Sequence, residues 1–178
     1  MNIQTTHNHS MTTASLRYRL PAQQQIVTAK AADCDAVVSL FGALHAYNAS
    51  LDPHFALAAG WESLLREQFL ATGDNTDKLW LLVKDGEEAV GLLIAGVHTD
   101  SPLFKYRHWI EVEALYVAES QRGSGIAHRL LNRAYTWAED KGLSRVQLYV
   151  TASNIRAQSV YNEQGFTATQ AIMRKSLR

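Results

Sequence analysis

The 178-residue sequence predicts an α/β domain with the element order β-α-α-β-β-β-α-β-α-β. Two observations lead to this fold class. Runs of strand-forming residues alternate along the chain with segments in which apolar residues recur at helical spacing. Between Glu111 and Lys141, a strand, a tight glycine turn and an amphipathic helix follow one another directly, which is typical of a sheet covered by helices.

The first half of the chain is expected to form a strand, two helices and a hairpin. The strand covers residues 26–29, and the first helix begins near Asp33 and runs to Tyr47. After a loop over residues 48–60, the second helix covers residues 61–70. The next two strands, 79–84 and 89–98, flank Asp85-Gly86, which is a dipeptide that favours hairpin turns.

The second half continues with a long strand that ends at Val117 and a helix that starts at Ile126. Gly142 follows that helix, as expected for a left-handed C-terminal cap. A strand over residues 145–150, a helix capped by Asn154, and a last strand over residues 166–173 complete the expected order.

Composition narrows the function classes. Seventeen basic and seventeen acidic residues balance, so we expect no nucleic-acid partner and no membrane partner. One cysteine, Cys34, permits no internal disulfide and indicates a reducing compartment, hence a cytoplasmic protein. Residues 1–24 are polar and predict a mobile tail, with a targeting segment as the alternative, and residues 25–178 predict a single domain.

The glycine turn at Arg122-Gly123-Ser124-Gly125 is expected to bind an anion. The first turn of a helix leaves backbone N–H groups without internal partners and carries partial positive charge. Glycines let a ligand approach those groups, and the Ser124 hydroxyl could add a further donor. The turn lacks the Lys-Ser/Thr end of a P-loop, and the Rossmann pattern fails at His128. A turn that only links the strand to the helix is the alternative.

Two motifs narrow the choice of anion. The first is Arg122-x-x-Gly125-x-Ala127, and the second is Asn154-x-x-Ala157-x-x-x-Tyr161-x-x-x-Gly165-Phe166. Together, and in this order, they resemble the coenzyme-A-binding signatures of the GNAT superfamily of N-acetyltransferases. For Tyr161, the alternative is a half-buried core tyrosine.

The resemblance implies a mixed twisted sheet of about six to seven strands with helices on both faces. It also implies that acetyl-CoA is the co-substrate and that no metal is used. The acceptor would be a small-molecule amine or a peptide amine, and a homodimer is among the expected assemblies. The residues that would bind the coenzyme are Leu115, Tyr116, Val117, Arg122, Gly123, Ser124, Gly125, Ile126, Ala127, Asn154, Ala157 and Tyr161.

Glu111 and Glu113 are the candidates for the general base. Strand alternation predicts that both point to one face, together with Leu115 and Val117. The resemblance favours Glu113 as the base, directly or through water, with Glu111 used in other branches of the superfamily. Ion pairs, or simple counter-charges for a cationic substrate, are the alternatives for both residues.

Two further groups would complete the chemistry that the resemblance implies. The Val117 N–H would stabilise the oxyanion, and the Tyr161 phenol, with an ordinary pKa of about 10, would be the general acid for the departing thiolate. The acceptor site would involve the stretch from His45 to His54, at the end of the first helix and in the loop after it, with His45, Tyr47, Asp52 and His54, together with the loop from Thr99 to Arg107. His128 is expected to be solvated. A non-catalytic module that only binds acetyl-CoA, or a scaffold with the same fold, remains the alternative function.

Overall fold

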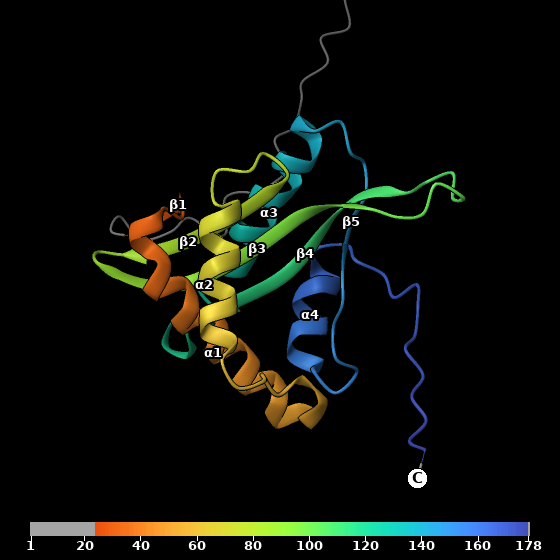
Figure 1. Cartoon of the computed structure of the whole chain (residues 1–178), viewed down its shortest axis with the longest axis horizontal. Helices are drawn as coiled ribbons and strands as arrows, with labels where there is room; N and C mark the ends of the chain where they lie inside the picture. Colours follow the sequence, from red (N-terminus) through yellow and green to blue (C-terminus); the bar gives the residue numbers. More distant parts are fainter. Residues whose placement is uncertain (1–23, 178) are drawn as a thin grey trace, which may run out of the picture.

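The computed structural model describes residues 24–177 (Figure 1). Its strands and α-helices are β1 (Gln24–Thr28), α1 (Cys34–Leu51), α2 (Trp61–Thr72), β2 (Lys78–Asp85), β3 (Glu88–Thr99), β4 (His108–Val117), α3 (Ile126–Asp140), β5 (Val146–Leu148) and α4 (Ile155–Glu163). Short 3-10 turns are η2 (Ala31–Asp33), η3 (Pro53–Phe55) and η4 (Glu119–Gln121). The tail predicted for residues 1–24 lies outside the described residues apart from Gln24, which opens β1.

The sheet has five strands in the order β1-β2-β3-β4-β5. The first four pair in antiparallel fashion, and β5 pairs with β4 in parallel, so the sheet is mixed as predicted. The predicted count of six to seven strands is wrong, because the strand expected over residues 166–173 does not form. Residues 167–171 are Thr, Ala, Thr, Gln and Ala, which offer no large apolar side chains to bury against a helix.

Helices cover both faces of the sheet, as predicted (Figure 1). On one face, Val37, Val38 and Phe69 from α1 and α2 pack on alternate sheet residues such as Trp80 and Leu92. On the other face, a second cluster joins the sheet to the apolar side of α3, with Val160 and Tyr161 of α4 at its margin. Its buried members are Leu81, Val83, Val90, Leu93, Ala95, Ile110, Val112, Ile126, Leu130, Leu131, Ala134 and Ala138. Among residues 24–177, no helix is long and apolar enough to cross a bilayer.

A β-bulge in the middle of β4 changes which side chains share a face. Ile94 pairs with Ala114 and Ala95 pairs with Val112, which leaves Glu113 as the extra residue. Val112 packs on the α3 side, whereas Ala114 packs on the α1–α2 side. The prediction that Leu115 and Val117 share a face with the two glutamates is therefore wrong. Both pack against the α3 cluster, because one extra residue inverts the alternation beyond the bulge.

The parallel strands β4 and β5 separate soon after they meet. Their pairing covers only residues 110–112 of β4 and 146–148 of β5. Beyond Val112, the remaining half of β4 pairs with β3 on one side, and no strand within residues 24–177 pairs with it on the other. The open edge of β4 leads directly into the glycine turn before α3.

Candidate functional site

The glycine turn forms the positive mouth of α3. Gly123 and Gly125 have φ of 82° and 83°, in the left-handed region that other residues enter only at a cost. Gly125 is the N-cap of α3, and the first bond back to it comes from the N–H of Arg129, at 3.1 Å. The N–H groups of Ile126 and Ala127 precede that bond, in the turn where a helix leaves its first N–H groups without partners inside the helix. A Cβ added at Gly123 would have no atom within 4 Å, so a ligand can reach the turn.

Two side chains of the turn are used internally. The Ser124 hydroxyl donates to the Gln121 carbonyl at 2.6 Å, so its proton is directed away from a ligand. The Arg122 side chain is only 18% exposed, and its guanidinium lies 5.4 Å from the Tyr47 ring and 5.9 Å from the Tyr116 ring. Its Nε donates to the Val117 carbonyl at 3.2 Å. The donors available to an anion here are therefore backbone N–H groups.

The open edge of β4 carries further unpaired backbone donors. The Ala118 N–H donates to the Val90 carbonyl of β3 at 2.8 Å. Because N–H groups alternate in direction along a strand, those of Leu115 and Val117 point to the opposite edge, where β5 has already diverged. An extended ligand could pair with this edge as an additional strand would.

The two glutamates point to the α1–α2 face, but in different surroundings. Oε2 of Glu113 forms a close ion pair with Nζ of Lys78 at the start of β2. Oε2 of Glu111 lies 3.7 Å from Nδ1 of His98 on β3, and the His98 ring stacks on Trp109 at 4.1 Å. The two carboxyl groups lie on one face of the sheet, as predicted. Each has a basic partner outside the sequence motifs, Lys78 for Glu113 and His98 for Glu111.

Tyr161 lies on α4, against the apolar cluster on the α3 side of the sheet. The Asn154 side chain accepts from the Ala157 N–H at 3.1 Å, so the predicted N-cap of α4 is confirmed. The Tyr161 ring contacts Phe166 edge-on, with centroids 5.7 Å apart. Burial raises the pKa of the Tyr161 phenol to about 12. The hydroxyl is therefore protonated, and able to donate a hydrogen bond, at any physiological pH.

His128 is buried, and the prediction that it is solvated is wrong. Its ring is 9% exposed, and Nε2 lies 3.4 Å from Oε2 of Glu163 at the end of α4. This contact shows that the end of α4 reaches a face of α3 that the sequence pattern leaves polar. His128 therefore connects the helix that begins at the glycine turn to the helix that carries Tyr161.

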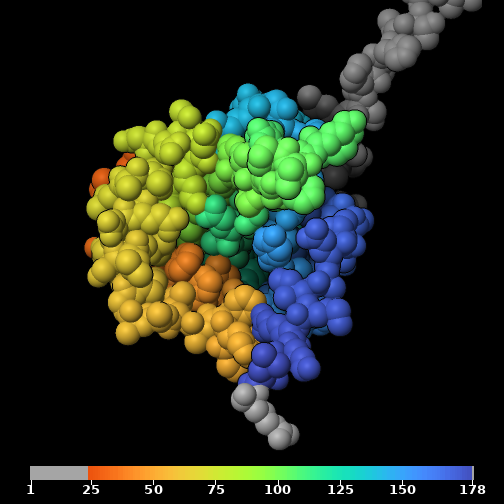
Figure 2. All heavy atoms as spheres, turned by 45° about the vertical axis from the view of Figure 1, so that its right-hand side comes forward, coloured from red at the N-terminus to blue at the C-terminus, as the bar shows by residue number. Residues whose placement is uncertain are grey.

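The loop expected to border the acceptor site contacts the C-terminal segment. Arg174 pairs with Oδ2 of Asp52, and its guanidinium lies 5.6 Å from the Phe55 ring. Figure 2 shows the C-terminal residues lying against the surface of this loop. The bond from Arg174, followed by those from the N–H and the ring of His54, lowers the pKa of Asp52 to about 2. Burial lowers the pKa of His45, so this ring is neutral at pH 7.

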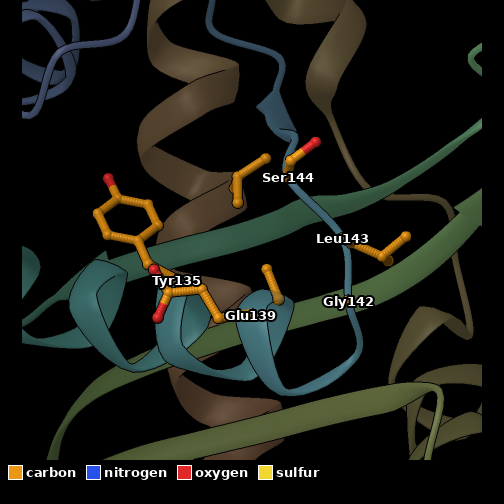
Figure 3. A pocket seen from close by; sticks show the side chains of 7 residues that line it. Tyr135, Glu139, Gly142, Leu143 and Ser144 are labelled. Atoms are coloured by element: carbon orange, nitrogen blue, oxygen red, sulfur yellow. The ribbon is translucent and has the colours of Figure 1, made fainter.

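A hollow of about 520 Å³ at the far end of α3 is not part of this site. It lies among Tyr135, Glu139 and residues 142–146, with Leu143 and Ser144 on the segment that follows the helix (Figure 3). Tyr135 is the lining residue nearest to the glycine turn along α3, and ten residues, about 15 Å at 1.5 Å per residue, separate it from Gly125.

Sequence reasoning missed Lys78, His98 and Arg174. None of them belongs to a motif, and each reaches the site only through strand register or a long-range contact. Within the described part of the chain, no group of three or more His, Cys, Asp or Glu residues is placed to hold a metal ion.

Comparison with known proteins identifies what the chain is similar to. The model of the acetyltransferase (GNAT) family matches residues 43–166, more than half of the chain. A mycothiol acetyltransferase of Beutenbergia cavernae is 34% identical over 89 residues, which are 50% of this chain and 28% of that protein. The chain thus spans less than a third of the length of that relative.

Two solved structures share the fold. A mutant form of the BH1408 protein from Bacillus halodurans superimposes with a TM-score of 0.76 at 20% identity, covering 86% of this chain and 99% of the other. An aminoglycoside N-acetyltransferase, AAC(6')-Iy, solved in complex with CoA, superimposes with a TM-score of 0.68 at 16% identity, covering 87% and 95%.

Proposed function

Because the chain belongs to the acetyltransferase (GNAT) family, we propose that it transfers the acetyl group of acetyl-CoA to a primary amine by direct attack in a ternary complex. The observation that carries the proposal is the arrangement around β4. A free backbone edge of β4 leads toward the first turn of α3, where Gly123 is exposed and Gly125 is buried, and two carboxylates stand on the same strand at or next to the bulge. This arrangement supports a thioester bound along the edge with an acceptor amine beside the glutamates.

The coenzyme would be held by backbone groups at two points. The diphosphate would accept from the N–H groups of the first turn of α3, around Gly123 to Ala127, where the helix dipole also favours negative charge. The pantetheine arm, which carries amide groups, would pair with the free edge of β4. Arg122 would act indirectly, because its side chain holds the Val117 carbonyl and stacks with Tyr47 and Tyr116.

The thioester carbonyl would lie against the same edge. The Val117 N–H points away from β3 and is the proposed donor to the oxyanion, and the Leu115 N–H points the same way. Such fixed backbone donors need no reorganisation as charge develops on the carbonyl oxygen.

The acceptor amine must lose a proton before it attacks. An alkyl amine with a pKa of about 10.4 carries a cost of roughly 4–5 kcal/mol for its neutral form at pH 7. Glu113 is the proposed proton acceptor, directly or through one water, with Glu111 and its neighbour His98 as the second candidate.

Tyr161 is the proposed general acid for the departing thiolate. A phenol whose pKa is raised to about 12 is fully protonated and is a stable hydrogen-bond donor. The contact of α4 with α3, through Glu163 and His128, supports a fixed position of Tyr161 relative to the glycine turn.

The acceptor is proposed as a small-molecule amine or a peptide amine. Two related proteins carry the names mycothiol acetyltransferase and aminoglycoside N-acetyltransferase, which supports a polar, amine-bearing small molecule. Cytoplasmic location, a homodimer, and the absence of a metal, a nucleic-acid partner and a membrane partner stay predictions.

A thiol-release assay with acetyl-CoA and a library of amines tests turnover and acceptor together. We expect acetyl-dependent thiol release with at least one primary amine, and a fall in kcat of about one to three decades in Glu113→Gln with Kd for acetyl-CoA unchanged. Glu111→Gln in parallel separates the two candidate bases. Binding of acetyl-CoA without turnover of any amine would favour the non-catalytic module instead.

A further inference from the structure

We propose that Lys78 is a positioning residue, which holds the carboxylate of Glu113 over the bare backbone of Gly96 so that one oxygen stays directed to the acceptor amine. This inference rests on the proposed role of Glu113 in acetyl transfer. In this proposal, Lys78 and Gly96, which lie outside every sequence motif, hold the base in position.

Strand register brings the three residues together. Lys78 of β2 stands opposite Gly96 of β3, and Gly96 stands opposite Glu111 of β4. Glu113 is the bulged residue just beyond, so it has no partner of its own on β3. The bulge therefore lets the Glu113 side chain extend back across β3 toward β2, where Lys78 meets it.

Gly96 provides the space for this crossing. A Cβ built on Gly96 would lie 2.8 Å from Oε1 of Glu113 and 3.6 Å from Nζ of Lys78. Any side chain at this position would occupy the place of the carboxylate. Because the atom displaced is the far end of a flexible side chain, the backbone itself need not move.

Lys78 is well suited to hold the carboxylate still. Its side chain is only 12% exposed, and Nζ lies 5.7 Å from the centre of the Trp80 ring, which is a buried core side chain. The Glu113 side chain is 38% exposed, so the pair has one fixed and one accessible member. Nζ binds Oε2, and Oε1 keeps lone pairs for a second donor.

The positive charge of Lys78 has a second consequence for the acceptor. A cation close to a titrating amine disfavours the protonated form of that amine. An acceptor that approaches Oε1 comes near Nζ as well, and so is biased toward the neutral form that attacks the thioester. Lys78 would then support deprotonation without itself touching the reacting atoms.

The test compares kcat, KM for acetyl-CoA and melting temperature in Lys78→Met, Lys78→Arg, Glu113→Gln and the double variant Lys78→Met/Glu113→Gln, using an amine that the wild type acetylates. We expect kcat of Lys78→Met to fall by about tenfold or more, with KM for acetyl-CoA within about twofold of wild type. The double variant should be only slightly slower than Glu113→Gln alone, and much faster than additive losses would make it, because Lys78 acts mainly through that carboxylate and its charge has only a smaller direct effect on the amine. Lys78→Arg should recover part of the loss.

Lys84→Met is the matched control. Lys84 lies on the same strand and forms an ion pair of the same kind with Asp33, at 2.6 Å, but it does not contact Glu113. If Lys78 had a purely structural role, both Lys→Met variants should have a lower melting temperature, and their kcat values should be similar to each other. The proposal predicts that only Lys78→Met loses turnover.

Gly96→Ala supplies a readout that needs no turnover. Its crystal structure should show the β3 and β4 backbones in place and the Glu113 carboxylate displaced from Lys78. A carboxylate still bound to Lys78 in this variant would overturn the proposal, as would an unchanged kcat in Lys78→Met or additive losses in the double variant. Full activity of Glu113→Gln would instead refute the proposed base itself, so the two failures are distinguishable.

Discussion

Replacing Tyr161 by phenylalanine removes one hydroxyl from the margin of the core and tests both its burial and its proposed chemistry. Burial raises the pKa of this phenol from 10.0 to about 12. At about 1.36 kcal/mol per unit, a shift of this size corresponds to roughly 3 kcal/mol between the protonated and ionised forms. The same burial keeps the hydroxyl protonated at neutral pH, as a hydrogen-bond donor to a thiolate must be.

The sign of the pH effect follows from the direction of this shift. Because the folded pKa lies above that of the unfolded chain, the contribution of Tyr161 to stability is fully present below about pH 10 and is lost as pH rises toward about 12. Tyr161→Phe should therefore lose less stability than wild type across that interval. At pH 7 the variant should show kcat lowered by about one to three decades, with affinity for acetyl-CoA retained.

The assay pairs steady-state kinetics with alkaline titration of phenolate absorbance. Tyr135→Phe is the control, since burial also raises the pKa of Tyr135 to about 12 and its hydroxyl has no hydrogen-bond partner within residues 24–177. We expect each variant to lose one late-titrating tyrosine and only Tyr161→Phe to lose turnover. An unchanged kcat at saturating acetyl-CoA would remove Tyr161 from the mechanism, and titration near the ordinary tyrosine value would refute the burial argument.

Two further predictions concern the ends of the site. Gly125→Val should abolish binding of acetyl-CoA measured by calorimetry, because a branched side chain is strained at a φ of 83° and would cover the N–H groups of α3; normal affinity would contradict the diphosphate placement. Arg174→Ala should raise the pKa of Asp52 from about 2 toward its ordinary value of 3.8. An NMR titration of the Asp52 carboxyl carbon measures this pKa in both proteins. In wild type the stabilisation from ionised Asp52 is present above pH 3.8 and is lost as pH falls through about 2. The variant should show a weaker acid dependence, because only the bonds from His54 then lower the pKa of Asp52.

The helix ends and the glycine turn were predictable because they depend on local chemistry. Gly123 and Gly125 adopt the left-handed conformation that the turn requires, Gly142 ends α3, and Asn154 caps α4 through a bond to a residue three positions on. Each of these features involves residues within one or two turns of chain, so a single sequence carries the signal.

The last strand was not predictable in the same way. Residues 166–173 have a pattern compatible with a strand, but a strand forms only where a neighbouring edge and a buried face are available. Instead Phe166 packs between Tyr135 and Tyr161, and Arg174 binds Asp52, so the segment follows long-range contacts.

By itself the sequence determined the element order through α4, the glycine turn at the start of α3 and the two glutamates on one strand. Only the tertiary structure decided which residues surround those glutamates. One extra residue at Glu113 turns Leu115 and Val117 to the other face, and strand register places Lys78 and Gly96 beneath the Glu113 carboxylate. Register and bulges are properties of paired strands, set by packing on both faces of the sheet, and no single strand encodes them.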